Sequence, residues 1–127
     1  MNESQARSWE RHRNAYVLDV PRGELSTSIA EGATVDWAAV FGRRAPLIVE
    51  IGSGAGDSLV PMAAGRPEAN VVAFEVFEPA VASTLGKIGR AGLTNVRMVV
   101  ADGSQGLERL FEDGSVQLRD LPGGDDP

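Results

Sequence analysis

Three acidic residues in the middle of the chain lie at the ends of apolar runs, where a chain usually buries hydrocarbon side chains. Glu50 and Glu75 come late in two such runs, and Asp102 lies just beyond a third. Acids are rarely buried without a partner, so each carboxylate requires a group that donates hydrogen bonds or carries positive charge. Backbone N–H groups of the next turn would satisfy a single acid of this kind. The threefold repetition of the pattern predicts a ligand site instead.

A loop that contains three glycines follows Glu50 almost directly. Its sequence, GSGAG at residues 52–56, is one residue shorter than the G-x-G-x-x-G fingerprint, in which the backbone approaches a pyrophosphate. Glu50 and Asp57 flank the loop, and their negative charge disfavours a phosphate. It favours a ligand with a positive centre, and S-adenosylmethionine has a sulfonium, an ammonium and no phosphate. We therefore predict S-adenosylmethionine as the cofactor, with an NAD(P)-dependent oxidoreductase as the less favoured alternative.

The other two acids fit the remaining parts of this cofactor. Glu75 comes 19 residues after Gly56, a position from which a carboxylate accepts both ribose hydroxyls. Asp102, or the backbone beside it, is placed to reach the amino edge of the adenine. These roles require the acids to lie along one edge of a sheet.

Hydrophobic patterns predict the elements that bring the acids together. The predicted strands are 47–51, 70–76 and 96–100, and the predicted helices are 59–64, 78–91 and 105–111. This alternation indicates an α/β fold, in which the chain holds the N-terminal half of a Rossmann-like, doubly wound parallel sheet. Ligands bind beyond the carboxyl ends of such strands. Glu50 is therefore expected at the rim of the sheet and not in the core.

The segments on either side of this unit have weaker patterns. Residues 1–45 are predicted to form an N-terminal arm with short helices, after a polar and flexible start. Residues 46–115 form the predicted cofactor-binding half-domain. Residues 116–127 are interpreted as an acidic, divergent tail, because 116–121 would make a poor buried strand. A three-stranded sheet would leave its apolar third strand at an edge, so self-association through that edge is expected.

Composition excludes several classes of protein and of site. The 127 residues, 43% of them hydrophobic, suffice for one small domain. The sequence has no cysteine, and its single His12 has no partner at metal-ligand spacing, so neither a disulfide nor a metal site is predicted. The lack of a long apolar stretch and the polar N-terminus indicate no membrane span, no signal peptide and a cytoplasmic location. The net charge of −6 is unlike that of a phosphate-binding surface.

Residues 15–115 also resemble the bacterial tRNA (guanine-N7-)-methyltransferase (TrmB) family of class I S-adenosylmethionine-dependent methyltransferases. The shared motifs are E-I-G-x-G-x-G-x-S-L at the loop, P-E-x-N before the second strand, E-V-x-E-P after it, and G-L-x-N-V-R before the third. The resemblance implies a Rossmann-like fold and methyl transfer from S-adenosylmethionine to N7 of a guanosine in the tRNA variable loop. It implies no catalytic residue. The cofactor-binding residues that it implies are Glu50, Gly52, Gly54, Glu75 and Asp102.

The resemblance ends after Asp113. The family continues with an apolar strand, the motif F-F-P-D-P-W and a basic K-K-R-H stretch, whereas this sequence reads QLRDLPGGDDP, with Asp125 near the family's Asp. We therefore expect the chain to provide the cofactor-binding half and to be inactive alone. An inactive remnant and a non-catalytic cofactor-binding module are the alternatives. Trp9 and residues 11–13 could contact tRNA, although such a stretch is more often a solvated terminus.

Overall fold

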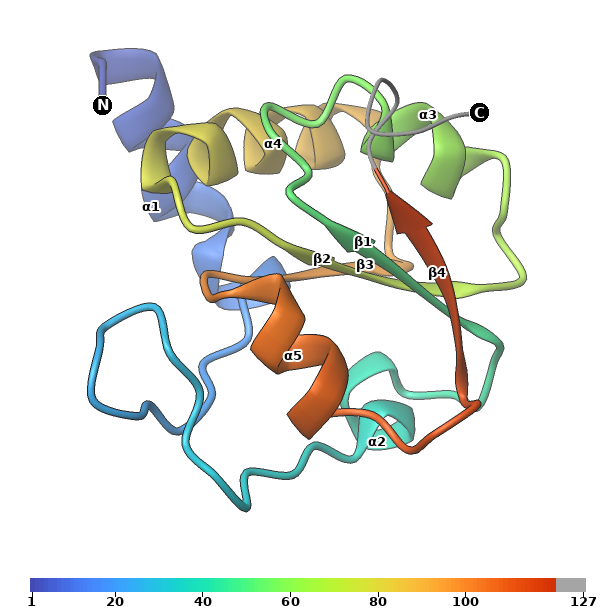
Figure 1. The fold of residues 1–127 in the computed structure, drawn as a ribbon. Coiled ribbons are helices and arrows are strands. Elements are labelled where there is room, and N and C mark those ends of the chain that lie inside the picture. Colours follow the sequence, from blue (N-terminus) through green and yellow to red (C-terminus); the bar gives the residue numbers. More distant parts are fainter. Residues whose placement is uncertain (121–127) are drawn as a thin grey trace.

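A parallel four-stranded sheet forms the centre of the molecule in the computed structural model, which describes residues 1–120. The strands are β1 (Leu47–Ile51), β2 (Asn70–Phe74), β3 (Val96–Val99) and β4 (Val116–Asp120). They lie in the order β3-β2-β1-β4, and every neighbouring pair is parallel (Figure 1). The chain runs outward from β1 to β3 and then returns to the other side of β1. The predicted Rossmann-like α/β fold is confirmed, with its topological switch point between β1 and β4.

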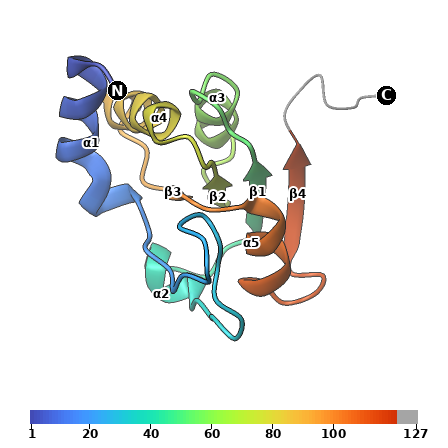
Figure 2. The ribbon, with the colours of Figure 1, turned by 60° about the vertical axis from the view of Figure 1, so that its left-hand side comes forward.

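Helices cover both faces of this sheet (Figure 2). On one face lie α3 (Leu59–Ala64) and α4 (Glu78–Ala91), with α1 (Glu3–Tyr16) beside α4, and on the other lie α2 (Trp37–Phe41) and α5 (Gly103–Arg109). Side chains alternate between the faces along each strand. Ile48 therefore joins the core beneath α3 and α4, and Val49 joins the core on the α5 side. None of the described helices is long and apolar enough to cross a membrane.

The expectation of a three-stranded sheet is wrong, because residues 116–120 form β4. This strand pairs in parallel with β1 over its whole length. Its alternation of Val116 and Leu118 with polar residues is unlike a strand buried on both faces. It suits an edge strand, which has one neighbour and retains solvent contact, and Leu118 is 46% exposed. Asp125 lies outside the described residues.

The opposite edge of the sheet, β3, is partly covered by the chain that follows α1. Val17 forms a parallel bridge with Met98, whose carbonyl oxygen accepts a hydrogen bond from the Leu18 N–H at 2.8 Å. The side chains of Val96 and Val99 are buried as well. Self-association through this edge stays a prediction. Because Val17 and Leu18 pair with Met98, β3 has fewer free backbone groups than an uncovered edge strand.

The N-terminus forms the 14-residue helix α1, where a flexible start was expected. Asn2 and Gln5 build a capping box: the Gln5 N–H donates to Asn2 Oδ1 at 2.7 Å, and the Asn2 N–H donates to Gln5 Oε1 at 2.9 Å. The helix packs on α4, where glycines allow Ser8 and His12 to approach closely. No residue of α1 is fully buried, so its hydrophobic pattern is a weak signal and its cap is the stronger one.

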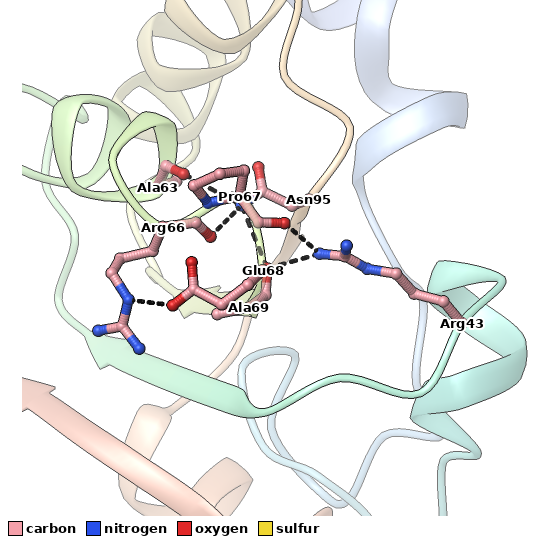
Figure 3. Close-up of polar contacts among 7 residues, drawn as sticks. All are labelled: Arg43, Ala63, Arg66, Pro67, Glu68, Ala69 and Asn95. Carbon is pink, nitrogen blue, oxygen red and sulfur yellow. Dashed lines mark hydrogen bonds and ion pairs between the residues drawn. The ribbon is translucent and has the colours of Figure 1, made fainter.

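Two polar side chains hold the connection between α3 and β2 (Figure 3). Asn95 Nδ2 donates to three carbonyl oxygens, those of Ala63 at 3.1 Å, Arg66 at 3.0 Å and Ala69 at 3.2 Å. The Arg43 guanidinium donates to the carbonyl oxygens of Pro67 and Ala69 at 2.8 and 2.9 Å. These bonds fix where β2 begins, and therefore where its carboxyl end lies.

We predict that Asn95→Ala lowers the free energy of unfolding by about 1–3 kcal/mol, because buried carbonyl groups lose their hydrogen-bond donor. Asn95 is 7% exposed, so water does not readily replace its amide. Urea denaturation measures the change, with Thr94→Ala at the exposed neighbouring residue as the control. A loss no larger than that of Thr94→Ala would show that the network does not stabilise the fold.

Candidate functional site

The glycine loop, residues 52–56, joins β1 to α3 at the carboxyl end of the sheet. The Gly52 N–H donates to the carbonyl oxygen of Phe74, the last residue of β2, at 2.8 Å. The φ angles of Gly52, Gly54 and Gly56 are 72°, 58° and 89°, a region that residues with a Cβ rarely adopt. The glycines therefore allow a tight turn whose backbone stays open to a ligand.

Glu75 ties this loop to the end of β2 through both carboxylate oxygens. Oε1 accepts a hydrogen bond from the Gly54 N–H at 2.8 Å. Oε2 accepts hydrogen bonds from the N–H groups of Val76 and Phe77 at 3.0 and 3.1 Å. Glu75 is partly exposed, and each carboxylate oxygen can accept more than one hydrogen bond. The side chain therefore shapes the loop and still has acceptor capacity for a ligand.

Two residues of α4 hold the loop from another side, and sequence reasoning missed both. Thr84 Oγ1 lies 3.1 Å from the carbonyl oxygen of Gly54 and 2.9 Å from that of Ala80 in its own helix, so its one hydrogen is shared between the two acceptors. Lys87 Nζ donates to the Ala55 carbonyl oxygen at 2.8 Å, and it pairs with Asp57 Oδ1 at 2.7 Å. Residues three apart share one face of a helix. The spacing places both side chains on one face of α4, but it does not show that the glycine loop lies against that face.

An open pocket of about 400 Å³ lies between the loop and the end of β3, and Gly52, Glu75 and Asp102 all line it. Asp102 also caps α5, because its Oδ1 accepts a hydrogen bond from the Ser104 N–H at 2.9 Å. This cap starts the helix two residues earlier than predicted. Within residues 1–120, no group of three or more His, Cys, Asp or Glu side chains could hold a metal ion.

Glu50 is the exception among the predicted site residues, because its side chain is 0% exposed and does not line this pocket. Its expected place at the rim is wrong: the pleat of β1 points the side chain toward the same face as Ile48. There Oε1 accepts a hydrogen bond from Arg119 Nε of β4 at 3.1 Å. Burial raises the pKa of the Glu50 carboxyl, and the Arg119 guanidinium offsets part of that rise.

A second feature of this buried region is a pair of polar atoms without partners. Among the described residues, neither Glu50 Oε2 nor Ser53 Oγ has a hydrogen-bond partner, although both atoms are buried. Most buried polar atoms in folded proteins do have one. Glu50 Oε2 and the hydroxyl of Ser53 in the glycine loop are therefore two acceptor-bearing groups that a ligand could still satisfy.

Residues 44–118 match a family model described as "Putative methyltransferase". This span covers more than half of the chain and includes the loop and all five predicted site residues. The chain belongs to this methyltransferase family. The match confirms the methyltransferase resemblance of the sequence, and a family of this kind implies a methyl donor.

Curated tRNA (guanine-N(7)-)-methyltransferases are similar to this chain over most of its length. The one from Cutibacterium acnes is 48% identical over 121 residues, which make up 95% of this chain and 43% of the relative. That of Nocardioides sp. is 54% identical over 106 residues, 84% of this chain and 43% of the relative. That of Paenarthrobacter aurescens is 47% identical over 109 residues, 86% of this chain and 36% of the relative. The chain spans less than half the length of these curated relatives.

We predict that the unaltered chain loses stability relative to the Glu50→Gln variant as the pH rises, with stability measured as the free energy of unfolding. Burial raises the pKa of Glu50 above its ordinary value of 4.5. The folded state therefore binds this proton more tightly than the unfolded state does, and the stabilisation is lost as the pH rises through the folded pKa. Urea denaturation between pH 4.5 and neutral pH measures the trend, with Glu10→Gln at an exposed acid of α1 as the control. A difference that grows with pH would show that the ion pair with Arg119 outweighs burial.

We also predict that Gly56→Ala destabilises the chain more than Gly114→Ala does. Both glycines have positive φ angles, 89° and 74°, so both substitutions introduce backbone strain of about 1–2 kcal/mol. At Gly56 the added Cβ would lie 2.8 Å from Thr84 Cγ2, whereas at Gly114 nothing lies within 4 Å. Urea denaturation gives the two losses. Equal losses would show that the loop does not depend on close packing against α4.

Proposed function

We propose that the glycine loop binds S-adenosylmethionine for a tRNA (guanine-N7-)-methyltransferase of the cytoplasm, which methylates N7 of a variable-loop guanosine. The family match supports a methyl donor, and the names of the relatives support tRNA as the substrate. The observation that carries the proposal is the loop itself. Its glycines have positive φ angles, and it is anchored on the Glu75 carboxylate beside an open pocket.

The residues that line the pocket suit the nucleoside part of this cofactor. Glu75, whose Oε1 accepts a single hydrogen bond, would accept a second one there from a ribose hydroxyl. Asp102 or its neighbouring backbone would reach the adenine. Gly52 and Gly54 have no side chains that would keep a ligand from the loop backbone. None of these roles needs a phosphate-binding group, which agrees with acids on both sides of the loop.

The unsatisfied polar atoms beneath the loop suit the methionine end. Glu50 Oε2 is a buried acceptor without a donor, and Ser53 Oγ is a buried hydroxyl without a partner. An ammonium would supply the missing donor, and a carboxylate would supply an acceptor for the hydroxyl. The cofactor carries both an ammonium and a carboxylate, so it has a group of the right kind for each of the two atoms.

Methylation of guanine N7 requires little acid–base chemistry from the protein. N7 has a lone pair and no proton, so no general base is needed, and no residue of this chain is assigned a catalytic role. When bound, the cofactor supplies a methyl group on a sulfonium. The residues described above would hold that group in line with N7 and keep carboxylates near its positive charge.

One part of the N-terminal segment supports a nucleotide contact. Trp9, Arg13 and Arg22 line an open hollow of about 440 Å³, which shares Thr27 with the cofactor pocket. The guanidinium carbon of Arg13 lies 6.0 Å from the centre of the Trp9 ring. His12 instead packs against α4. Aromatic and arginine side chains bind bases and phosphates of single-stranded nucleic acid, and a solvated helix surface is the alternative explanation.

The second candidate function is a module that binds the cofactor without catalysing transfer. The net charge of −6 favours it, because tRNA binding depends on neutralising phosphates. Transfer of a labelled methyl group to unmodified tRNA by the purified chain distinguishes the two. We expect the chain to bind cofactor without methylating tRNA by itself. Methylation by the purified chain would contradict that expectation and establish the enzyme.

We predict that calorimetry shows S-adenosylmethionine binding, and that Glu75→Ala weakens it at least about 10-fold, or about 1.4 kcal/mol. The substitution removes both the ribose acceptor and the anchor of Gly54. Glu108→Ala, at an exposed acid of α5, is the control, and circular dichroism checks that each variant folds. Absence of binding, or enhanced NADH fluorescence on mixing, would contradict the proposal and favour the alternatives.

A further inference from the structure

The carboxylate of Glu50 already has a cationic partner within the chain. Glu50 and Arg119 are register partners on the neighbouring strands β1 and β4, so their side chains project side by side from one face of the sheet. Arg119 Nε lies 3.1 Å from Glu50 Oε1. Its Nη2 donates to Ser58 Oγ, just before α3, at 2.6 Å. The guanidinium therefore bridges the buried acid and the end of the glycine loop.

This partner occupies the carboxylate that the proposed function assigns to the ammonium group of the cofactor. Glu50 is 0% exposed, and a buried acid has room for few neighbours. The guanidinium satisfies only Oε1 and leaves Oε2 without a partner. A second cation brought to the same carboxylate would also be repelled by the guanidinium at this short range, because burial weakens the screening by water.

We propose that Arg119 competes with the ammonium group of S-adenosylmethionine for Glu50, so that this arginine sets the affinity for the methionine end of the cofactor. This inference rests on the proposed function. Competition requires that the cofactor binds only the fraction of molecules in which Arg119 has left Glu50. The apparent dissociation constant then exceeds the intrinsic one by the reciprocal of that fraction.

The surroundings of Arg119 allow it to leave. Its side chain is 36% exposed, whereas that of Glu50 is 0% exposed. It comes from an edge strand and lines an open hollow of about 560 Å³, together with Asp57 and Ser58. Asp57, which pairs with Lys87 through Oδ1, has an 87% exposed side chain and lines the same hollow. The arginine can therefore turn outward while keeping water and an acid close to its charge.

Calorimetry with two ligands tests this competition. Methylthioadenosine has the adenosine part of the cofactor but no ammonium or carboxylate. We expect Arg119→Met to bind S-adenosylmethionine about 10-fold more tightly than the unaltered chain. A gain of this size corresponds to an arginine that occupies Glu50 in roughly nine molecules of ten. The affinity for methylthioadenosine should stay within about twofold, because this ligand does not reach Glu50.

A second variant covers the risk that Arg119→Met leaves a buried acid unpaired and fails to fold. Ser58→Ala removes one anchor of the guanidinium and keeps both charges, and we expect a smaller gain, about two- to threefold, for S-adenosylmethionine alone. If the ion pair has only a structural role, the substitutions change the midpoint of unfolding but do not change the affinity for one ligand more than for the other. Equal affinity changes for both ligands, no change for S-adenosylmethionine, or weaker binding of it would each overturn the inference. Failure of every variant and of the unaltered chain to bind either ligand would overturn the proposed function, and the inference with it.

Discussion

The carboxylate of Glu75 fixes the geometry on which the rest of the site depends. The glycine loop has no large side chain that could hold its shape by packing, so hydrogen bonds must do so. Glu75 holds the N–H of Gly54, and Thr84 and Lys87 hold the carbonyl oxygens of Gly54 and Ala55 from α4. The acid that we propose as a ribose acceptor is thus also part of the wall of the pocket. Its two roles agree physically, because a loop fixed in advance loses less entropy when a ligand binds.

Most of the parallel sheet and its helices could be predicted from sequence, because their signals are local. Strands buried on both faces have continuous apolar runs, and Gly and Pro mark the ends of their helices. β4 could not be recognised in the same way, since an edge strand needs only half of that pattern. The contacts of Thr84 and Lys87 were missed because they join residues about 30 positions apart, and no local pattern encodes such a distance.

The position of Glu50 shows how sequence reasoning can give a residue the wrong surroundings. Its sequence position near the end of β1 is compatible with the rim, but the pleat directs its side chain to the face of Ile48. The partner of the acid could not be inferred while Arg119 was placed in a tail. Because β4 pairs with β1, Arg119 lies beside Glu50 on the neighbouring strand and forms an ion pair with it. A buried charge requires a partner of this kind. The site therefore has two levels: an open pocket beside Glu75 and a closed ion pair at Glu50.

Titration of S-adenosylmethionine into the isotope-labelled chain, followed through its backbone amide resonances, tests most directly whether the glycine loop is the cofactor site. We expect the largest shifts at residues 52–56 and at Val76 and Phe77, whose N–H groups share the Glu75 carboxylate with the loop. The amides of the capping box at the start of α1 should not move. Shifts centred on other residues, or no shifts at all, would contradict this assignment of the site.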